Sequence, residues 1–300
     1  MIDQLTARPI LDSRGEWTIE VVMMAAGRRA VALVPQGESR GSHEVIALPV
    51  EVAVKNIIEI ISPAIMGNKL GDQSSLDTKL KELDGTATKS NLGGNAILGV
   101  SMAYARLSAL TEGLPLWQYL RQLAATKHSV WVSVLPVTPP RLLSLMIEGG
   151  LHAPGGSPFQ EYLVLPRAIT IIESVSIVTK LYGALRKLIG ERFDPVATRL
   201  GDEGAFAPPI ADPLTPFALI IEAGEASGLA DKFDVGLDAA ANNTSLNPEE
   251  LITVYEKMRA NYPLRYLEDP FNENDIDHFA SLSAKYGNET MIVGDDLTVT

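Results

Sequence analysis

A strand-sized apolar run that ends in an acid occurs three times near the end of the chain. The runs are FDVGLD, LRYLE and MIVGD, and their final acids, Asp238, Glu268 and Asp295, lie 30 and 27 residues apart. Between the first two runs, Asn247-Pro248-Glu249-Glu250 has the capping residue, first-position proline and early carboxylates that begin a helix. An interval of about 30 residues is one βα unit. The repeat therefore predicts an α/β fold with parallel strands, either an open sheet or a β/α barrel.

These three acids are expected to lie close together, because the carboxyl ends of parallel strands meet at one edge and neighbouring strands are ~4.8 Å apart. Like charges at that spacing repel unless a cation or a proton lies among them. The chain has no cysteine and only four histidines, and oxygen ligands alone select Mg²⁺ or a similar hard ion. One strand-end acid can simply cap the next helix, but three in successive units favour a metal site.

The first 125 residues have a different pattern, which predicts a small α+β domain. Two β-rich stretches between Thr18 and Val34 are separated by Gly27-Arg28 and indicate an antiparallel hairpin. Helical periodicity follows over Val50–Ile61 and Ala96–Leu110. We place the domain boundary here, with residues 1–125 in one domain and 126–300 in the other. In the second domain, strands are expected at Trp131–Leu135 and Tyr162–Leu165 and a long helix at Ile169–Ile189.

Charge and hydropathy exclude several classes of partner. The net charge of −12 repels the phosphates of nucleic acid and anionic lipid. The start of the chain has no apolar stretch of signal-peptide length, and no run of ~18 apolar residues occurs anywhere. We therefore expect a cytoplasmic protein with no nucleic-acid partner and no membrane partner. The absence of cysteine also excludes disulfides, thiolate nucleophiles and Cys-based metal sites.

Two glycine-rich loops carry further polar side chains. GDEGAFAP, from Gly201 to Pro208, places two acids between glycines, and the apolar Phe206 suggests a loop tucked into a pocket where a carboxyl can stay protonated. GGLHAPGGSPFQE, from Gly149 to Glu161, contains His152 and ends just before a predicted strand. A lone loop histidine is more often solvated than catalytic, so His152 alone indicates little.

Six segments of the sequence together resemble the signature segments of the enolase family, in the family's order. They are LDSRGEWTIEV, ELDGTATKSNLGGNAILGVSMA, GDEGAFAP, VGLDAA, YLEDPF and IVGDDLTVT. The resemblance implies a small α+β N-terminal domain followed by a β/α (TIM-like) barrel. It also implies a lyase that reversibly dehydrates 2-phosphoglycerate to phosphoenolpyruvate in glycolysis with two Mg²⁺ ions, and a homodimer in the complete form.

The resemblance also implies roles for individual residues. Asp238, Glu268 and Asp295 match the carboxylate ligands of the tightly held Mg²⁺. Glu203 matches the general acid that helps the C3 hydroxyl depart, and Glu161 belongs to the same proton network. His152 matches a histidine that a mobile loop brings to the substrate, and Ser39 lies on the loop that closes over the second Mg²⁺. Fixed cations are needed because removing a proton next to a carboxylate creates further negative charge.

The chain departs from the family pattern in two ways. The family's lysine base lies on a sixth barrel strand and has no counterpart here; only 170 residues run from Trp131 to Thr300, whereas eight βα units need ~240. We therefore expect about five of eight barrel strands, an incomplete enolase, and no activity from residues 1–300 alone. Locally, PQGESRG surrounds the metal-loop serine, Glu148 replaces an asparagine, Leu151 replaces a serine, and Ala241-Asn242-Asn243 replaces Ser-Glu-Phe.

These departures leave two alternatives to an enolase. One is a non-catalytic enolase-like protein that serves as a binding or scaffold partner, which the missing base and the altered loops favour. The other is an enzyme that acts on a different carboxylate with an abstractable α-proton. The three metal carboxylates and Glu203 favour the enolase, because a protein without catalysis would have no need of them.

Overall fold

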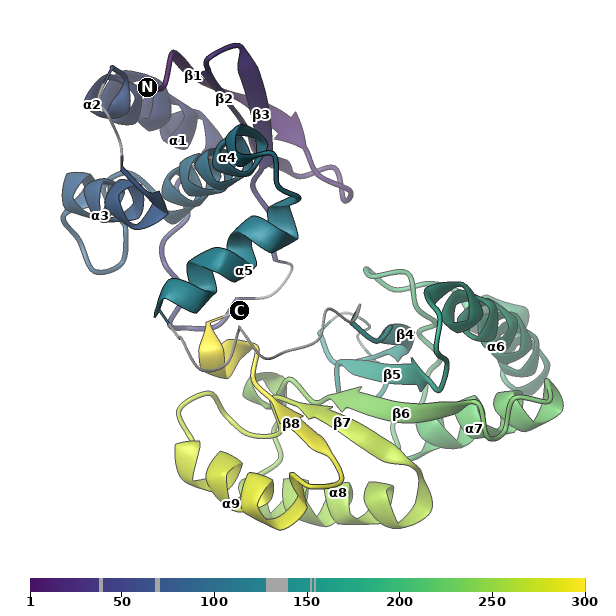
Figure 1. Ribbon diagram of the computed structural model, residues 1–300. Helices are drawn as coiled ribbons and strands as arrows, with labels where there is room; N and C mark the ends of the chain where they lie inside the picture. Colours follow the sequence, from purple (N-terminus) through teal and green to yellow (C-terminus); the bar gives the residue numbers. More distant parts are fainter. Residues whose placement is uncertain (38–39, 68–70, 128–139, 152, 154, 300) are drawn as a thin grey trace. The chain divides into compact units, whose positions relative to one another are not determined.

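A computed structural model describes residues 1–37, 40–67, 71–127, 140–151, 153 and 155–299. The chain divides into two compact units, Met1–Val137 and Thr138–Thr300 (Figure 1). Each unit has its own sheet and its own hydrophobic core. The boundary placed after residue 125 stays a prediction, and the predicted strand Trp131–Leu135 falls outside the described residues.

The first unit contains a three-stranded antiparallel sheet. Its strands are β1 (Gln4–Leu11), β2 (Trp17–Ala25) and β3 (Arg28–Leu33), in that order across the sheet. Strand β2 buries alternate side chains completely, among them Ile19, Val21 and Met23, as expected for a sheet with one covered face. The β2–β3 turn has Ala26 and Gly27 with φ of 48° and 74°, which matches the type I′ hairpin. The predicted hairpin is therefore present.

Helices cover this sheet. The first, α1 (Val50–Asn56), continues through a π-helical turn, η1 (Ile57–Ile61), into α2 (Ser62–Ile65); then come α3 (Gln73–Asp84), α4 (Gly94–Glu112) and α5 (Leu116–Lys127). Helix α4 packs on β2 and β3, and Gly99 permits the close approach, because a Cβ there would lie 2.7 Å from Val21 Cγ2. Both helices expected from periodicity are present.

The second unit is built on a five-stranded mixed sheet whose order across the sheet is also the order along the chain. Its strands are β4 (Ser144–Glu148), β5 (Glu161–Pro166), β6 (Phe233–Asp238), β7 (Leu264–Glu268) and β8 (Met291–Val293). The last three are parallel, as predicted, whereas β4, β5 and β6 pair antiparallel. The described residues of the β4–β5 connection, 149–151, 153 and 155–160, contain no helix, and a chain that returns directly pairs antiparallel. In the described part of the chain the sheet is open.

The second unit has four helices in its described residues, and the sequence pattern predicts all of them except Thr215–Ala226. They are α6 (Ile171–Arg192), α7 (Thr215–Ala226), α8 (Pro248–Asn261) and α9 (Ile276–Tyr286), with 3₁₀ turns η2 (Pro195–Thr198), η3 (Ala241–Asn243) and η4 (Asp296–Thr298). The start of α8 is a capping box in which Asn247 and Glu250 each accept the other's backbone N–H, at 3.0 and 2.9 Å. No helix in the described ranges is long and apolar enough to cross a membrane.

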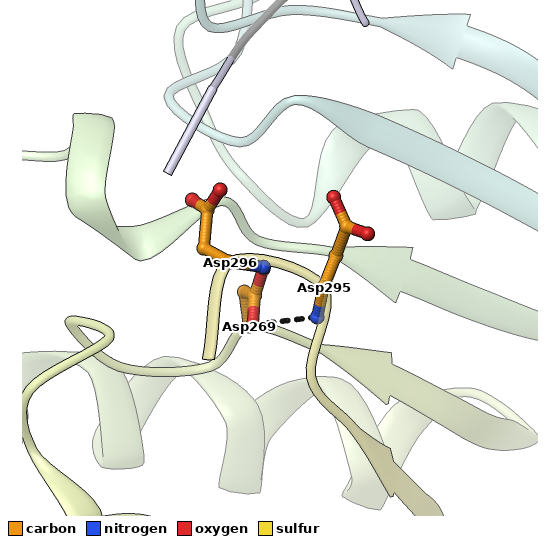
Figure 2. Close-up of side chains that lie close together, drawn as sticks. All are labelled: Asp269, Asp295 and Asp296. Atoms are coloured by element: carbon orange, nitrogen blue, oxygen red, sulfur yellow. Dashed lines mark hydrogen bonds between the residues drawn. The ribbon is translucent and has the colours of Figure 1, made fainter. Parts of the chain in front are cut away.

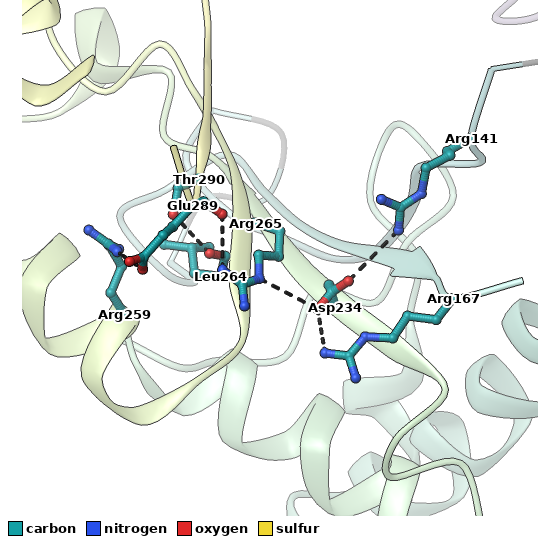
Figure 3. Close-up of polar contacts among 8 residues, drawn as sticks. All are labelled: Arg141, Arg167, Asp234, Arg259, Leu264, Arg265, Glu289 and Thr290. Carbon is teal, nitrogen blue, oxygen red and sulfur yellow. Dashed lines mark hydrogen bonds and ion pairs between the residues drawn. The ribbon is translucent and has the colours of Figure 1, made fainter. Parts of the chain in front are cut away.

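A cluster of ion pairs lies at the amino end of β6, opposite to Asp238. The Asp234 carboxylate meets Arg167 at 2.5 Å, Arg141 at 3.7 Å and Arg265 at 3.9 Å (Figure 3). Arg167 follows β5 and Arg265 lies in β7, so the cluster links three neighbouring strands. Because the arginines are about half exposed, we expect each pair to contribute little stability, of order 0–1 kcal/mol.

Candidate active site

Three acids occupy facing positions on neighbouring strands of the second unit. Glu161 begins β5, Asp238 ends β6 and Glu268 ends β7. In the ladder, Asp238 pairs with Glu161 on one side and with Glu268 on the other. Directly paired residues project from the same face of a sheet, with Cβ atoms roughly 5 Å apart. The carboxyl groups of Glu161, Asp238 and Glu268 therefore form a row, which lies at the carboxyl ends of β6 and β7.

Asp295 lies two residues beyond β8, in a loop shaped by a different acid. Asp269 accepts the backbone N–H groups of Asp295 and Asp296, at 3.1 and 2.8 Å (Figure 2). It is 4% exposed and has a φ of 37°. Carboxylate oxygens of these three aspartates lie within 4.8 Å of one another. Because both oxygens of Asp269 accept backbone hydrogen bonds, Asp269 fixes the loop, and Figure 2 shows the other two carboxyl groups pointing to the same side of it.

The row of acids holds protons unusually tightly. Burial, followed by the charge of Glu268, raises the pKa of Asp238 to about 8. Burial, the hydrogen bond with Glu203 and the charge of Asp238 raise the pKa of Glu161 to about 9. Burial also raises the pKa of Glu268, against the hydrogen bond that Tyr266 donates to it at 2.6 Å. Crowded acids of this kind are stabilised either by protons or by a cation.

A buried amide oxygen of Gln160 is a second indication that a proton donor or a cation is required here. The Nε2 of Gln160 donates to Asp238 Oδ2 at 3.2 Å, and Gln160 is 7% exposed. Its Oε1 is buried and has no hydrogen-bond partner among the described residues, a situation that costs roughly 1–3 kcal/mol unless a donor or cation is supplied. Carboxylate oxygens with a free amide oxygen beside them form a donor set that fits a hard divalent metal.

The segment GDEGAFAP forms a tight loop against the row. Gly201 donates its N–H to the carbonyl of Ala205 at 3.0 Å, and Gly204 has a φ of 85°. Phe206 is 1% exposed and stacks on Tyr182 with ring centroids 4.4 Å apart, so the loop is tucked in, as its apolar residue indicated. The second of its two acids, Glu203, hydrogen-bonds to Glu161. The structure thus brings the two predicted proton-transfer residues together.

Two of the residues predicted for the site cannot be located in the structure. Ser39 and His152 lie outside the described residues. Of the predicted metal ligands, Asp238 and Glu268 are ladder neighbours, whereas Asp295 is grouped with Asp269 and Asp296.

Several residues that shape the site are not predicted from the sequence, although most of them are neighbours of a predicted one. Asp269 and Asp296 are the second acids of the YLEDPF and IVGDDLTVT segments, and Gln160 precedes Glu161. In the sequence, Asn242 is distinguished only as part of a departure from the family pattern. Its Nδ2 donates to Asp296 Oδ2 at 2.8 Å and its Oδ1 accepts the Glu273 N–H at 3.0 Å, so it connects the loops that follow β6, β7 and β8.

Comparisons with known proteins agree with this arrangement. Residues 2–120 match the enolase N-terminal domain, and residues 133–246 and 242–300 match the enolase C-terminal TIM barrel domain. Enolase B of Dictyostelium discoideum is 35% identical over 334 residues, covering 100% of this chain and 74% of that protein. The enolases of Thermococcus kodakarensis and Methanopyrus kandleri are each 37% identical, covering 100% of this chain and 73% and 74% of theirs. The chain therefore belongs to the enolase family.

Proposed function

We propose that this protein is a Mg²⁺-dependent enolase that interconverts 2-phosphoglycerate and phosphoenolpyruvate. The observation that carries the proposal is the row of Glu161, Asp238 and Glu268 at paired positions of β5, β6 and β7, with Glu203 hydrogen-bonded to one end of it. Asp238 and Glu268 are suited to bind a cation, and Glu161 together with Glu203 is suited to transfer a proton. Both are required to remove water from a substrate that already carries a phosphate and a carboxylate.

Asp238, Glu268 and Asp295 are the residues that would hold the metal ion. Mg²⁺ prefers carboxylate oxygens and usually keeps some of its water. When bound, the ion offsets the negative charge that develops on the substrate carboxylate as the neighbouring carbon loses its proton. Asp269 supports the set by fixing the backbone of Asp295. A role for Ser39 at a second ion is a further part of the proposal.

Glu203 and Glu161 would handle the proton that the departing C3 hydroxyl requires. In the metal-free protein the raised pKa of Glu161, about 9, keeps a proton on the pair at neutral pH, and the hydrogen bond lets the two carboxyl groups share it. We assign proton delivery to the C3 oxygen to Glu203, because the resemblance places the general acid there. Substrate contact by His152 is proposed on the same ground. No residue between 1 and 300 is assigned as the proton-abstracting base.

The test is turnover of 2-phosphoglycerate by the protein expressed from its complete reading frame and freed of host enolase. Phosphoenolpyruvate formation is followed by ultraviolet absorbance, with Mg²⁺ and with EDTA. We expect activity that requires the metal and that is lost in Glu203→Gln, while Glu249→Gln, an exposed acid of α8, leaves it unchanged. Equal turnover by Glu203→Gln and the unsubstituted protein would contradict the assignment.

The substrate is a small molecule, the complete protein is a homodimer, and it acts in the cytoplasm without nucleic-acid or membrane partners. A non-catalytic binding protein is not favoured, because the relatives at 35–37% identity are enolases. Light scattering and cell fractionation would test the dimer and the location separately from turnover.

A further inference from the structure

A further acid, Glu148, lies next to the proposed proton-transfer pair, Glu203 and Glu161. Glu148 is the last residue of β4 and pairs with Glu161 in the ladder. Its side chain is fully buried, with 0% exposure. The backbone of the same strand end is joined to the GDEGAFAP loop, because Glu148 donates its N–H to the carbonyl of Phe206 at 3.0 Å and Phe206 donates to the carbonyl of Met146 at 3.1 Å. Glu148 thus lies between the sheet and the loop that carries Glu203.

The carboxyl group of Glu148 accepts hydrogen bonds from that loop with both of its oxygens. Oε1 accepts the N–H of Ala205 at 2.8 Å, and Oε2 accepts the N–H of Glu203 at 3.3 Å. Two acceptor oxygens on one side chain suit a carboxyl group and not an amide, because an amide offers one acceptor and one donor on that fork. The two bonded amides are on either side of Gly204, so they fix the turn from which the Glu203 side chain projects.

The glycine at the start of the loop is explained by the same carboxyl group. A Cβ on Gly201 would lie 2.3 Å from Glu148 Cδ and 2.5 Å from Oε2. The backbone of Gly201 is not in the left-handed region, so its conformation would accept an alanine. The constraint at Gly201 is therefore the space that Glu148 occupies, and the two positions fit only as a pair.

We propose that Glu148 is a positioning residue, whose carboxylate holds the 201–207 loop so that Glu203 meets Glu161. The functional part of this proposal rests on the role proposed above for Glu203. This role explains the glutamate at position 148, where the family usually has asparagine. The asparagine side chain is shorter and offers a single acceptor oxygen, whereas Glu148 binds two backbone N–H groups of the loop.

Hydrogen exchange of the loop amides, followed by NMR on the metal-free protein, tests the geometry without requiring turnover. In Glu148→Ala, the amides of Glu203 and Ala205 should exchange about tenfold to a hundredfold faster, as expected for loss of hydrogen bonds to a charged acceptor. In Glu148→Gln, which has nearly the same shape, one of the two amides should lose its protection, because the amide nitrogen cannot accept. Met258→Ala, a fully buried residue of α8, is the control for general destabilisation and should leave loop exchange unchanged.

Gly201→Ala provides a second, independent variant. It should accelerate exchange of the same two amides in the natural background and have no further effect in Glu148→Ala, since the obstructing carboxylate is then gone. If Glu148→Gln protects both amides as well as the natural residue does, or if Gly201→Ala acts equally in both backgrounds, the proposal is wrong.

Kinetics then separate this proposal from the proposed function. In the active protein, Glu148→Gln should lower kcat and leave KM nearly unchanged, because Glu203 acts on the departing hydroxyl in the transition state. An unchanged kcat beside altered exchange would refute the positioning role. No turnover by the unsubstituted protein would refute the proposed function, and the exchange result for Glu148 would still stand.

Discussion

Replacing Asp238 with asparagine should change how the stability of the metal-free protein depends on pH. Asp238 has an ordinary pKa of 3.8 that is raised to about 8 in the folded chain. The folded state therefore binds a proton that the unfolded state has released over this range. The stability contributed by that proton is fully present below pH 4 and is lost as the pH rises toward 8.

The magnitude follows from the linkage relation. One proton held only by the folded state lowers the free energy of unfolding by about 1.4 kcal/mol for each pH unit, or roughly 4 kcal/mol between pH 5 and pH 8. Asp238→Asn removes this proton and also part of the repulsion felt by Glu161. Asparagine keeps one acceptor oxygen for the two donors that Asp238 binds, Gln160 Nε2 and the Ala240 N–H, so the absolute stability of the variant is lower at some pH values. The quantity to compare is the slope, which should be shallower by about 1.4 kcal/mol per pH unit.

Urea denaturation in EDTA at pH 5, 6, 7 and 8, followed by circular dichroism, measures this slope. Asp231→Asn, which replaces an exposed acid just before β6, is the matched control. Equal slopes for Asp238→Asn and the unsubstituted protein would show that Asp238 is ionised in the folded state, and would refute the reasoning.

Three further predictions concern metal and turnover. Mg²⁺ should raise the melting temperature of the second unit, by the equivalent of ~2.7 kcal/mol at a hundredfold excess over Kd, and Asp238→Ala should abolish most of the rise; an equal shift with K⁺ at matched ionic strength would contradict a specific site. In the active protein, Glu203→Gln should keep this Mg²⁺ effect and lose ~10²- to 10⁴-fold in kcat, and an unchanged kcat would remove Glu203 from the mechanism. A polypeptide of residues 1–300 alone should form no measurable phosphoenolpyruvate and should self-associate through the open edge of β8; a monomer with ordinary enolase turnover would show that the expected lysine base is not needed.

Six of the eight strands in the described residues, most helices and the positions of the acids could be predicted from the sequence because they depend on local pattern, whereas β1 and β4 could not. FDVGLD and LRYLE are apolar runs of strand length whose last residue is an acid, and Asn247 begins a helix through its neighbours alone. Such signals do not require knowledge of the partner strand. The N-terminal hairpin is of the same kind, since the Gly27 turn is set by its own backbone.

Features that depend on how strands meet could not be predicted. The pairing of Glu148 with Glu161, and of Glu161 with Asp238, follows from the antiparallel order of β4, β5 and β6, which no short segment encodes. Asp269 is held at a positive φ by bonds to a loop 26 residues later. The sequence marks it only as the second acid of a pair, so its structural use could not be separated from metal binding.

The strand order of the second sheet has a consequence for how the chain folds during synthesis. Each strand from β5 to β8 pairs with the one made just before it, so none of these strands must insert between two strands that are already paired. Growth at a single edge leaves three of the four connections short, at residues 149–160, 239–263 and 269–290, whereas the β5–β6 connection spans residues 167–232. Short loops cost the least entropy and form fastest. The nascent sheet therefore extends one strand at a time, and each strand emerging from the ribosome finds its partner already in place.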